Sequence, residues 1–247
     1  MKTHEKYKKY ISDQRAFFDR LITHDLDSYN DRMWDYSRRF EVHKILSIAK
    51  PKTVLNIGSG CGFHDSIFSA SEDIQHILSM DYSEKSIEHS NKIHASPKIS
   101  RVIFDILSDD IDSLGKFDLV TSFQVIEHIE DYNLFMKKSC ALLNPGGRLA
   151  IATPNYDRFQ NRILSFFGKK KQLCDPMHFK EFTINELLAL GEKNTLRHLK
   201  TFGYGFSFNI KYHFDNFLPK KILFYLGRVF KKHSNILIVI FEKRSIG

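Results

Sequence analysis

Three glycines, Gly58, Gly60 and Gly62, directly follow a short apolar run at residues 53–57, and this loop constrains the fold most strongly. Glycine permits positive φ and lets the backbone approach a ligand closely, because no Cβ stands in the way. A dinucleotide-binding loop needs G-x-G-x-x-G, but its third glycine position is Phe63 here, which argues against a nicotinamide dehydrogenase. The absence of a GK[ST] sequence excludes a phosphate-binding P-loop. A tight structural turn has a similar sequence, so the loop by itself does not identify a ligand.

Short β-type runs and helical segments alternate from about residue 50 to residue 153. Helices are expected after Gly62, from Ser83, and over residues 131–143, where the sequence N-P-G-G at 144–147 is a strong turn signal. The expected strands are residues 53–57, 76–80, 100–104, 117–122, 148–153 and 236–241. This alternation is typical of βαβ units, and it predicts an α/β fold with a doubly wound, mostly parallel sheet.

Two acids stand at the ends of successive expected strands. Asp81, after the second strand, can accept hydrogen bonds from both hydroxyls of a ribose. Asp105, after the third strand, can accept a hydrogen bond from an adenine amino group. One such acid alone is better explained as the cap of the next helix. Two acids at successive strand ends behind a G-x-G-x-G loop favour a nucleoside site.

Five segments occur in order between residue 53 and about residue 154: VLNIGSGCG, MDYS, FDI, FDLVTSFQVIEHIED and LLNPGGRLAIATPN. Together they resemble class I S-adenosylmethionine-dependent methyltransferases, and they are similar to the ubiquinone-biosynthesis O-methyltransferase-like branch. The resemblance implies a Rossmann-like, seven-stranded sheet with a reversed final strand, which residues 236–241 would supply. It also implies that S-adenosyl-L-methionine is the cofactor.

The resemblance assigns the glycine loop to the methionine part of the cofactor, Asp81 to the ribose, and Tyr82 to the face of the adenine. The residues expected to contact the cofactor are Gly58, Ser59, Gly60, Gly62, Asp81, Tyr82, Asp105, Ile106 and Phe123. Asn56 departs from the family, which more often has Asp at this position. An amide keeps the hydrogen bonds but not the charge, so a modest loss of cofactor affinity is expected.

A chain of 247 residues can bury one large core, so we expect a single methyltransferase domain over residues 1–247. Residues 1–49 are expected to form N-terminal helices, and residues 50–154 the cofactor-binding core. Residues 155–247 supply substrate-side connections, a C-terminal cap insertion and the last strands. Long connections at the carboxyl edge of such a sheet usually serve binding, because the ligand crevice lies there.

Methylation of a hydroxyl requires removal of its proton, so a base or a metal ion is expected beside the methyl group. The catalytic candidates are Glu127 and His128, after the fourth strand, and His178, after the fifth. QVIEH and the later DPMHFKEFT resemble two metal-using O-methyltransferase groups, the ubiquinone-biosynthesis enzymes and the enzymes that methylate the terminal 2′-hydroxyl of small RNAs. Their pattern, E-x-x-E-H with a later His, would place a divalent cation on these three residues.

Gln124 stands where that pattern has its first acid, and loss of one carboxylate weakens a site for a hard cation. Many relatives carry the E-H pair with no metal, so the sequence favours a metal-free site in which His128 acts as the general base. Two simpler interpretations stay open: His128 as a satisfied helix-start residue, and His178 as a hydrogen-bonded loop histidine.

Residues 205–234 are rich in Phe, Tyr and Lys, and apolar residues recur at helical spacing within residues 220–230. Burial of this stripe against the domain is its simplest explanation. A lid over the acceptor pocket, a dimer contact and a membrane-surface helix are the alternatives. Near the N-terminus, the residues that can either roof the pocket or belong to the core are Tyr29, Trp34, Tyr36 and Arg39.

Lys and Arg (37) exceed Asp and Glu (29) by 8, but the excess is scattered, which favours a lysine-rich surface over a nucleic-acid partner. Cys61, Cys140 and Cys174 lie far apart with no CxxC pair, so no disulfide framework or thiolate zinc site is expected. MKTHEKYKKY lacks the apolar run of a signal peptide, and no stretch approaches a membrane span. We expect a cytoplasmic protein without stable membrane insertion, in an oligomeric state that stays open.

These observations predict methylation of an oxygen atom of a small metabolite, such as a sugar or a polyketide- or quinone-like compound. The missing N-P-P-Y-type tetrapeptide after the fourth strand disfavours methylation of amino groups in DNA or glutamine. RNA ribose 2′-O-methylation is an alternative, supported by the Glu-His and later His pattern and opposed by Gln124. A binding protein that keeps the cofactor fold without catalysis is a further alternative.

Overall fold

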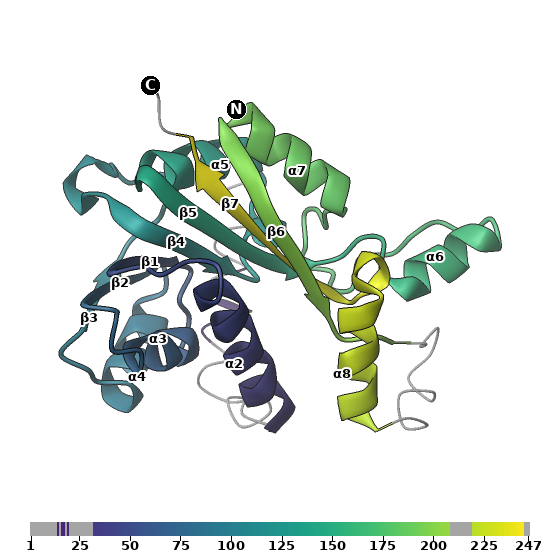
Figure 1. The fold of residues 1–247 in the computed structure, drawn as a ribbon, viewed down its shortest axis with the longest axis horizontal. Coiled ribbons are helices and arrows are strands. Elements are labelled where there is room, and N and C mark those ends of the chain that lie inside the picture. Colours follow the sequence, from purple (N-terminus) through teal and green to yellow (C-terminus); the bar gives the residue numbers. More distant parts are fainter. Residues whose placement is uncertain (1–13, 15, 18, 20–31, 208–218, 245–247) are drawn as a thin grey trace.

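The computed structural model of the chain describes residues 14, 16, 17, 19, 32–207 and 219–244. Its centre is a seven-stranded sheet with the order β3-β2-β1-β4-β5-β7-β6, in which β7 is antiparallel to both neighbours and the other pairs are parallel (Figure 1). The strands are β1 (Thr53–Ile57), β2 (His76–Asp81), β3 (Ile99–Ile103), β4 (Phe117–Phe123), β5 (Leu143–Pro154), β6 (Leu196–Tyr204) and β7 (Ile236–Lys243). The expected doubly wound α/β fold with a reversed final strand is confirmed.

Helices cover both faces of the sheet (Figure 1). One face carries α2 (Arg32–Leu46), α3 (Phe63–Ser69), α4 (Glu84–Ile93) and α8 (Lys220–Val229). The other face carries α5 (Tyr132–Ala141) and α7 (Ile184–Lys193). Each face has its own apolar core, with Phe68 and Phe224 buried on the first face and Phe135 and Leu187 on the second. A sheet that is buried on both faces explains the near-continuous apolar runs of β1 and β4.

Strand β6 lies at the edge of the sheet, and no expected strand corresponded to it. Its residues Arg197, His198 and Lys200 are polar and exposed, so the sequence lacks the apolar run of a central strand. Pairing with β7, rather than intrinsic preference, holds β6 in the sheet.

The turn expected at residues 144–147 lies inside β5. Leu143 already pairs with Phe117, and the register then shifts so that Arg148 pairs with Leu119. Gly146 has a φ of 71° within this irregular segment. The turn is therefore a bulge that lengthens the strand, and regular pairing resumes at Arg148, where the strand was expected to begin.

The peripheral segments surround the carboxyl ends of the central strands. Helix α6 (Phe159–Phe166) projects from the connection after β5, and α8 packs against β6 (Figure 1). Leu223, Phe224 and Gly227 form the buried side of α8, which confirms burial for part of its apolar stripe. Among the described residues, no helix combines the length and the apolar character needed to cross a bilayer.

Candidate functional site

A cavity of about 590 Å³ opens at the carboxyl ends of β1, β2, β3, β4 and β5, and Pro154 at the end of β5 contributes to it. Its wall includes the segments that directly follow these strands, at residues 57–61, 81–82, 104–107 and 123–129. Helix α2 and the connection after β5 close it from the sides, and Gln14 and Phe17 add to the wall. Every expected cofactor and catalytic residue lines this cavity except Gly62. Gly62 instead begins α3 with a φ of 76°.

The glycine loop turns sharply at the carboxyl end of β1. Gly58 has a φ of +68°, and a Cβ at this position would lie 2.4 Å from Cγ2 of Val125. Gly60 has a φ of +52°, and a Cβ added there would meet no atom within 4 Å, so its backbone faces open space. Both positions need a left-handed backbone, and Gly58 also needs the close approach of the segment after β4. The loop and the β4 end are thereby held together.

Replacement of Gly58 by Ala is expected to destabilise the fold by about 3 kcal/mol, because the left-handed backbone and the clash with Val125 both add to the cost. Thermal unfolding measures the change. Gly168 is the matched control, since its φ is +69° but no atom lies within 4 Å of the added Cβ. Gly168→Ala is expected to cost only about 1 kcal/mol. Equal losses in the two variants would contradict the packing argument.

Asp81 is buried and held by two backbone donors. Its Oδ2 accepts a hydrogen bond from Gly60 N (2.9 Å) and its Oδ1 one from Ser83 N (2.9 Å). Burial raises the pKa of this carboxyl, while the two backbone hydrogen bonds oppose that rise. Each carboxylate oxygen can accept a second hydrogen bond. The carboxylate can thus take two further donors, as a ribose diol would supply.

Asp105 also lines the cavity, but its carboxylate is engaged by its own loop. Oδ1 accepts from Leu107 N (2.9 Å), and Oδ2 accepts from Ser108 Oγ (2.8 Å). Its local turn is therefore explained without a ligand, in line with the simpler interpretation of a single strand-end acid. Ile106 and Tyr82 line the same part of the cavity, which suits a flat apolar group.

Asn56 does not line the cavity. Its Nδ2 donates to Oδ1 of Asp65 (2.7 Å), and its Oδ1 accepts from Oγ1 of Thr121 (3.1 Å). Ser79 Oγ donates to the other oxygen of Asp65 (2.6 Å). Asp65 is fully buried, and burial raises the pKa of its carboxyl. The amide at position 56 is therefore the partner of a buried acid, and a second acid there would face Asp65 directly.

Several cavity residues carry no local sequence signal. Arg38 on α2 is 8% exposed, and its guanidinium lies 4.0 Å from the centre of the Phe63 ring. It is the only Lys or Arg among the described residues that line the cavity. Glu41, one turn further along α2, accepts from His64 Nε2 (2.7 Å) and from Tyr204 Oη (2.7 Å). These contacts join α2, α3 and β6, so only the fold could reveal them.

The residues near the N-terminus that were expected either to roof the pocket or to belong to the core have different surroundings in the structure. Trp34 lines the cavity, as expected for a residue that roofs it. Tyr36 instead packs on Phe224 of α8 with ring centres 4.9 Å apart, and Arg39 forms an exposed ion pair with Asp35. Tyr29 lies outside the described residues.

Glu127 lies in the short 3₁₀ helix Ile126–His128 and is fully buried. Its Oε2 accepts from Thr153 Oγ1 (2.9 Å), whereas its Oε1 has no hydrogen-bond partner among the described residues. Burial raises the pKa of this carboxyl to about 7. The neighbouring Gln124 has a φ of 57° and a buried amide nitrogen that lacks a partner in the described part of the chain. Strain and unpaired polar atoms of this kind concentrate at functional sites.

His128 lines the same cavity as Glu127, but its electrostatic surroundings differ from those of Glu127. Its Nδ1 lies 3.2 Å from the carbonyl oxygen of Met177 and 3.4 Å from Nε2 of Gln14. Burial and the nearby His178 lower the pKa of His128 to about 4. The imidazole is therefore neutral near pH 7 and binds a proton weakly, which weakens it as a general base.

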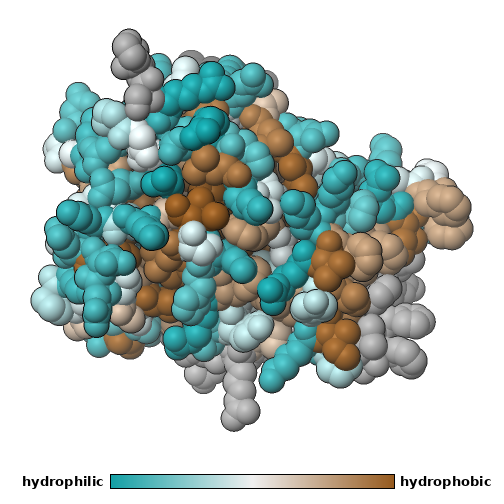
Figure 2. All heavy atoms as spheres, in the orientation of Figure 1, coloured by the Kyte–Doolittle hydropathy of each residue, from teal (hydrophilic) through white to brown (hydrophobic). Residues whose placement is uncertain are grey.

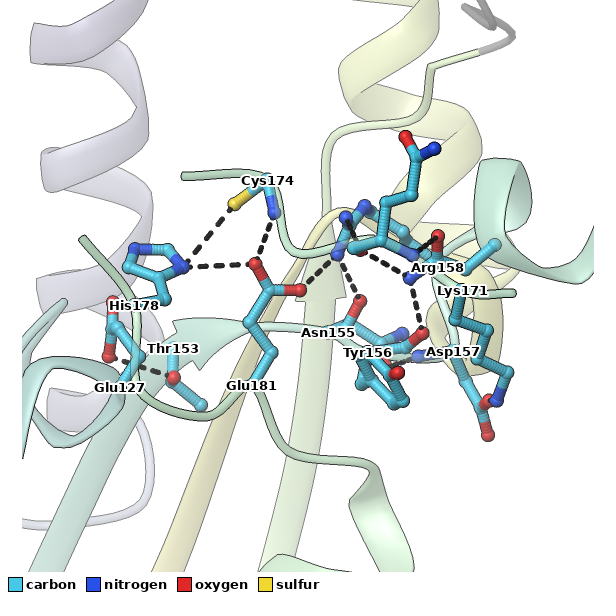
Figure 3. Close-up of polar contacts among 12 residues, drawn as sticks. Glu127, Thr153, Asn155, Tyr156, Asp157, Arg158, Lys171, Cys174, His178 and Glu181 are labelled. Carbon is cyan, nitrogen blue, oxygen red and sulfur yellow. Dashed lines mark hydrogen bonds and ion pairs between the residues drawn. The ribbon is translucent and has the colours of Figure 1, made fainter. Parts of the chain in front are cut away.

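His178 comes from the connection after β5, and its ring centre lies 4.7 Å from that of His128. Its Nδ1 bonds Oε1 of Glu181 (2.9 Å), so the ring presents Nε2 to the cavity (Figure 3). Arg158 pairs with the other oxygen of Glu181. Burial opposes ionisation of Glu181, but the bonds from His178 and from the Cys174 backbone, with the charge of Arg158, lower its pKa. A charged carboxylate behind a histidine fixes its tautomer and orientation.

Glu127, His128 and His178 each offer one donor atom, and these atoms lie within 4.8 Å of one another. One carboxylate with two imidazoles suits a borderline transition metal better than Mg²⁺, which prefers oxygen ligands. Gln124 supplies no carboxylate. The same three groups can also accept and pass a proton, since one of them titrates near neutrality.

The sequence model of a family described as "Methyltransferase domain" matches residues 29–200. The ubiquinone biosynthesis O-methyltransferase of Rhodopseudomonas palustris (strain TIE-1) is 30% identical over 120 residues, or 48% of this chain and 46% of that protein. The Pelagibacter ubique (strain HTCC1062) protein of the same name is 28% identical over 137 residues, or 53% of this chain and 56% of that protein. The chain thus spans about half the length of these curated relatives.

Two solved structures share the fold. The N-methyltransferase NodS of Bradyrhizobium japonicum WM9, in complex with S-adenosyl-L-homocysteine, has a TM-score of 0.60 at 15% identity, covering 92% of this chain and 97% of that one. The small RNA methyltransferase HEN1 has a TM-score of 0.60 at 22% identity, covering 84% of this chain and 25% of that one.

Proposed function

Because this chain belongs to the methyltransferase-domain family and is a class I S-adenosylmethionine-dependent methyltransferase, we propose that it methylates an oxygen atom of a small molecule. The observation that carries this proposal is the buried Glu127, which lines the cavity with an unpartnered Oε1 and whose pKa is about 7. A group that exchanges a proton near neutral pH is what a hydroxyl acceptor needs.

The cofactor-binding half of the cavity is assigned from the residues that line it. Gly58, Ser59 and Gly60 border the methionine part, and Gly62 holds the turn behind them. Arg38 binds the methionine carboxylate, since it is the one cation among the described lining residues. Bound S-adenosylmethionine supplies an electrophilic methyl group on a positively charged sulfur.

The nucleoside part occupies the other end of this half. Asp81 accepts hydrogen bonds from the two ribose hydroxyls, because each of its oxygens can accept a second hydrogen bond in addition to the one from the backbone. Tyr82, Ile106 and Phe123 supply apolar contact surface, with Asp105 at the edge of the adenine. The ordered Asp81 carboxylate requires no rearrangement to bind, which favours affinity.

The catalytic half is assigned to Glu127, His128 and His178. Glu127, rather than His128, is proposed to remove the acceptor proton, because a pKa of about 4 leaves His128 a weak base. His178, oriented by Glu181, passes the proton on or holds the acceptor hydroxyl. The same three groups would hold a divalent metal if one is used, and their donor set allows it.

Oxygen and a small acceptor are supported by two findings. Two of the curated relatives, each matching about half of the chain, are named ubiquinone biosynthesis O-methyltransferases. The wall of the cavity includes the apolar side chains of Ile129, Pro154 and Ile236, which suits an apolar or aromatic acceptor. We further propose that the whole chain acts as a single domain in the cytoplasm, where its three free cysteines are stable.

The test uses purified protein, S-adenosylmethionine labelled in its methyl group, and a fractionated cell extract. Label in the small-molecule fraction, stable to conditions that cleave esters, is the expected result. Label in RNA would replace the proposal with ribose methylation. Cofactor binding by calorimetry without label in any fraction would contradict catalysis and support a binding protein.

A further inference from the structure

Six large apolar side chains stand exposed on α8, at Phe230 directly after it, and at the end of α6. Phe166 and Phe167 are the most open, at 85% and 68% exposure. The residues of this outer face are Phe166, Phe167, Ile222, Tyr225, Val229 and Phe230. Figure 2 shows brown and tan atoms over both helices on one side of the molecule. Exposed apolar groups gathered in this way usually mark an interaction surface.

The same segments are strongly basic. Residues 158–173 and 219–234 contain no Asp or Glu. The exposed cations among them are Arg162, Lys169, Lys170, Lys220, Lys221, Arg228, Lys231 and Lys232. Elsewhere the lysine excess is scattered, but here apolar and basic residues share one surface. Exposed apolar side chains together with basic residues are typical of a surface helix that lies in the headgroup region of an anionic membrane.

A groove of about 330 Å³ adjoins the outer face, between α2, β6 and α8. Four cations line it, Lys44, Lys200, Arg228 and Lys231, and no acid does among the described residues. Tyr225 and Val229 belong both to this groove and to the outer face. A cationic groove beside exposed apolar side chains matches an amphiphile, with its phosphate in the groove and its chains along the apolar residues.

We propose that this outer face docks the protein on the surface of an anionic phospholipid bilayer, with a lipid phosphate in the groove. The aliphatic side chains Ile222 and Val229 favour lipid over RNA, since single-stranded RNA binding relies on stacking aromatics. The docking requires no spanning segment. It goes beyond the methyl transfer proposed above and does not depend on it.

Docking would also place the catalytic cavity close to the bilayer. Arg158, the residue directly before α6, pairs with Glu181, which orients His178. The α6 segment is therefore continuous with the wall that supplies His178 (Figure 3). An acceptor dissolved in the membrane would reach the cavity from this side.

The test is flotation of the full chain with vesicles of phosphatidylcholine, with or without about 30% phosphatidylglycerol. We expect at least about tenfold stronger binding to the anionic vesicles, lost at about 0.5 M salt. Two variants, Phe166→Ser with Phe167→Ser and Lys221→Glu with Lys231→Glu, should each reduce binding about tenfold. The controls are Ile93→Ser on α4 with Ile103→Ser on β3, both exposed in the wild-type protein, and Lys85→Glu with Lys137→Glu.

Unchanged thermal unfolding and cofactor binding establish that the variants are folded. All four substituted residues of the outer face are exposed, so we expect the variants to fold normally. Equal binding to neutral and anionic vesicles, or equal losses in the control variants, would overturn the proposal. Tighter binding to a single-stranded RNA oligonucleotide than to anionic vesicles would overturn it in favour of a nucleic-acid partner. A variant that loses vesicle binding but keeps methyl transfer to a dissolved acceptor separates docking from the proposed function.

Discussion

Replacement of Glu127 by Gln is expected to reduce methyl transfer at least about 1,000-fold and to stabilise the fold at about pH 8. Glu127 is fully buried, and its pKa is raised from 4.5 to about 7. A raised carboxyl pKa means that the folded state binds the proton more tightly than the unfolded state does. Its contribution to the free energy of unfolding therefore falls as the pH rises from about 4.5 to about 7, and the loss is complete above pH 7.

The shift corresponds to a destabilisation of up to about 3 kcal/mol in the charged form, at about 1.4 kcal/mol per unit. Gln cannot ionise, so the variant escapes this cost. Denaturant unfolding with a metal chelator present should show a gain of about this size at about pH 8 and none at about pH 5. Glu88→Gln, an exposed change on α4, should alter neither stability nor turnover. A variant that keeps normal turnover would exclude Glu127 as the base.

Replacement of Asp81 by Asn is expected to weaken S-adenosylmethionine binding about 100-fold. The carboxylate accepts from Gly60 N and Ser83 N, and both of its oxygens are needed as acceptors. An amide has only one acceptor oxygen, so its NH₂ group must face one of these backbone donors. The loop and the ribose contacts are disturbed together. Isothermal titration calorimetry with S-adenosylmethionine measures the loss.

Asp105→Asn provides the comparison for this measurement. The Asp105 carboxylate accepts from Leu107 N and Ser108 Oγ within its own loop, and its proposed adenine contact is a single hydrogen bond, against two ribose hydroxyls for Asp81. A loss below about tenfold is expected. If Asp105→Asn weakened binding as much as Asp81→Asn, the two acids would share the nucleoside equally and the assignment of Asp81 as the main anchor would be wrong.

Binding of the cofactor should also depend on pH through Asp81. Burial raises the pKa of its carboxyl, so the proton is lost only at a higher pH than for an exposed Asp. The ionised form is the better acceptor for two hydroxyls, and affinity should fall as the solution is acidified. The calorimetric experiment reports this directly when it is repeated at decreasing pH.

Local sequence patterns were sufficient to predict the glycine loop, the strand-end acids and most of the strands of the sheet. The loop is specified by three glycines whose left-handed backbones no other residue adopts easily, and β1, β4 and β7 by apolar runs that only a doubly covered sheet can bury. These features depend on neighbours within a few residues. They appear in the chain before any long-range contact is known.

The sequence by itself thus determined the fold class, the cofactor and the short segments that meet at the cavity. Tertiary structure alone decided the rest, because those features depend on contacts between different elements of the fold. Pairing with β7 made an edge strand of the polar β6, and packing brought Asp65 to Asn56, Glu41 to Tyr204 and Arg38 to the cavity wall. Glu127 and His128 are adjacent in sequence, yet burial raises the pKa of one and lowers that of the other, since desolvation always opposes the charged form. The choice of base follows from that environment, which no sequence pattern records.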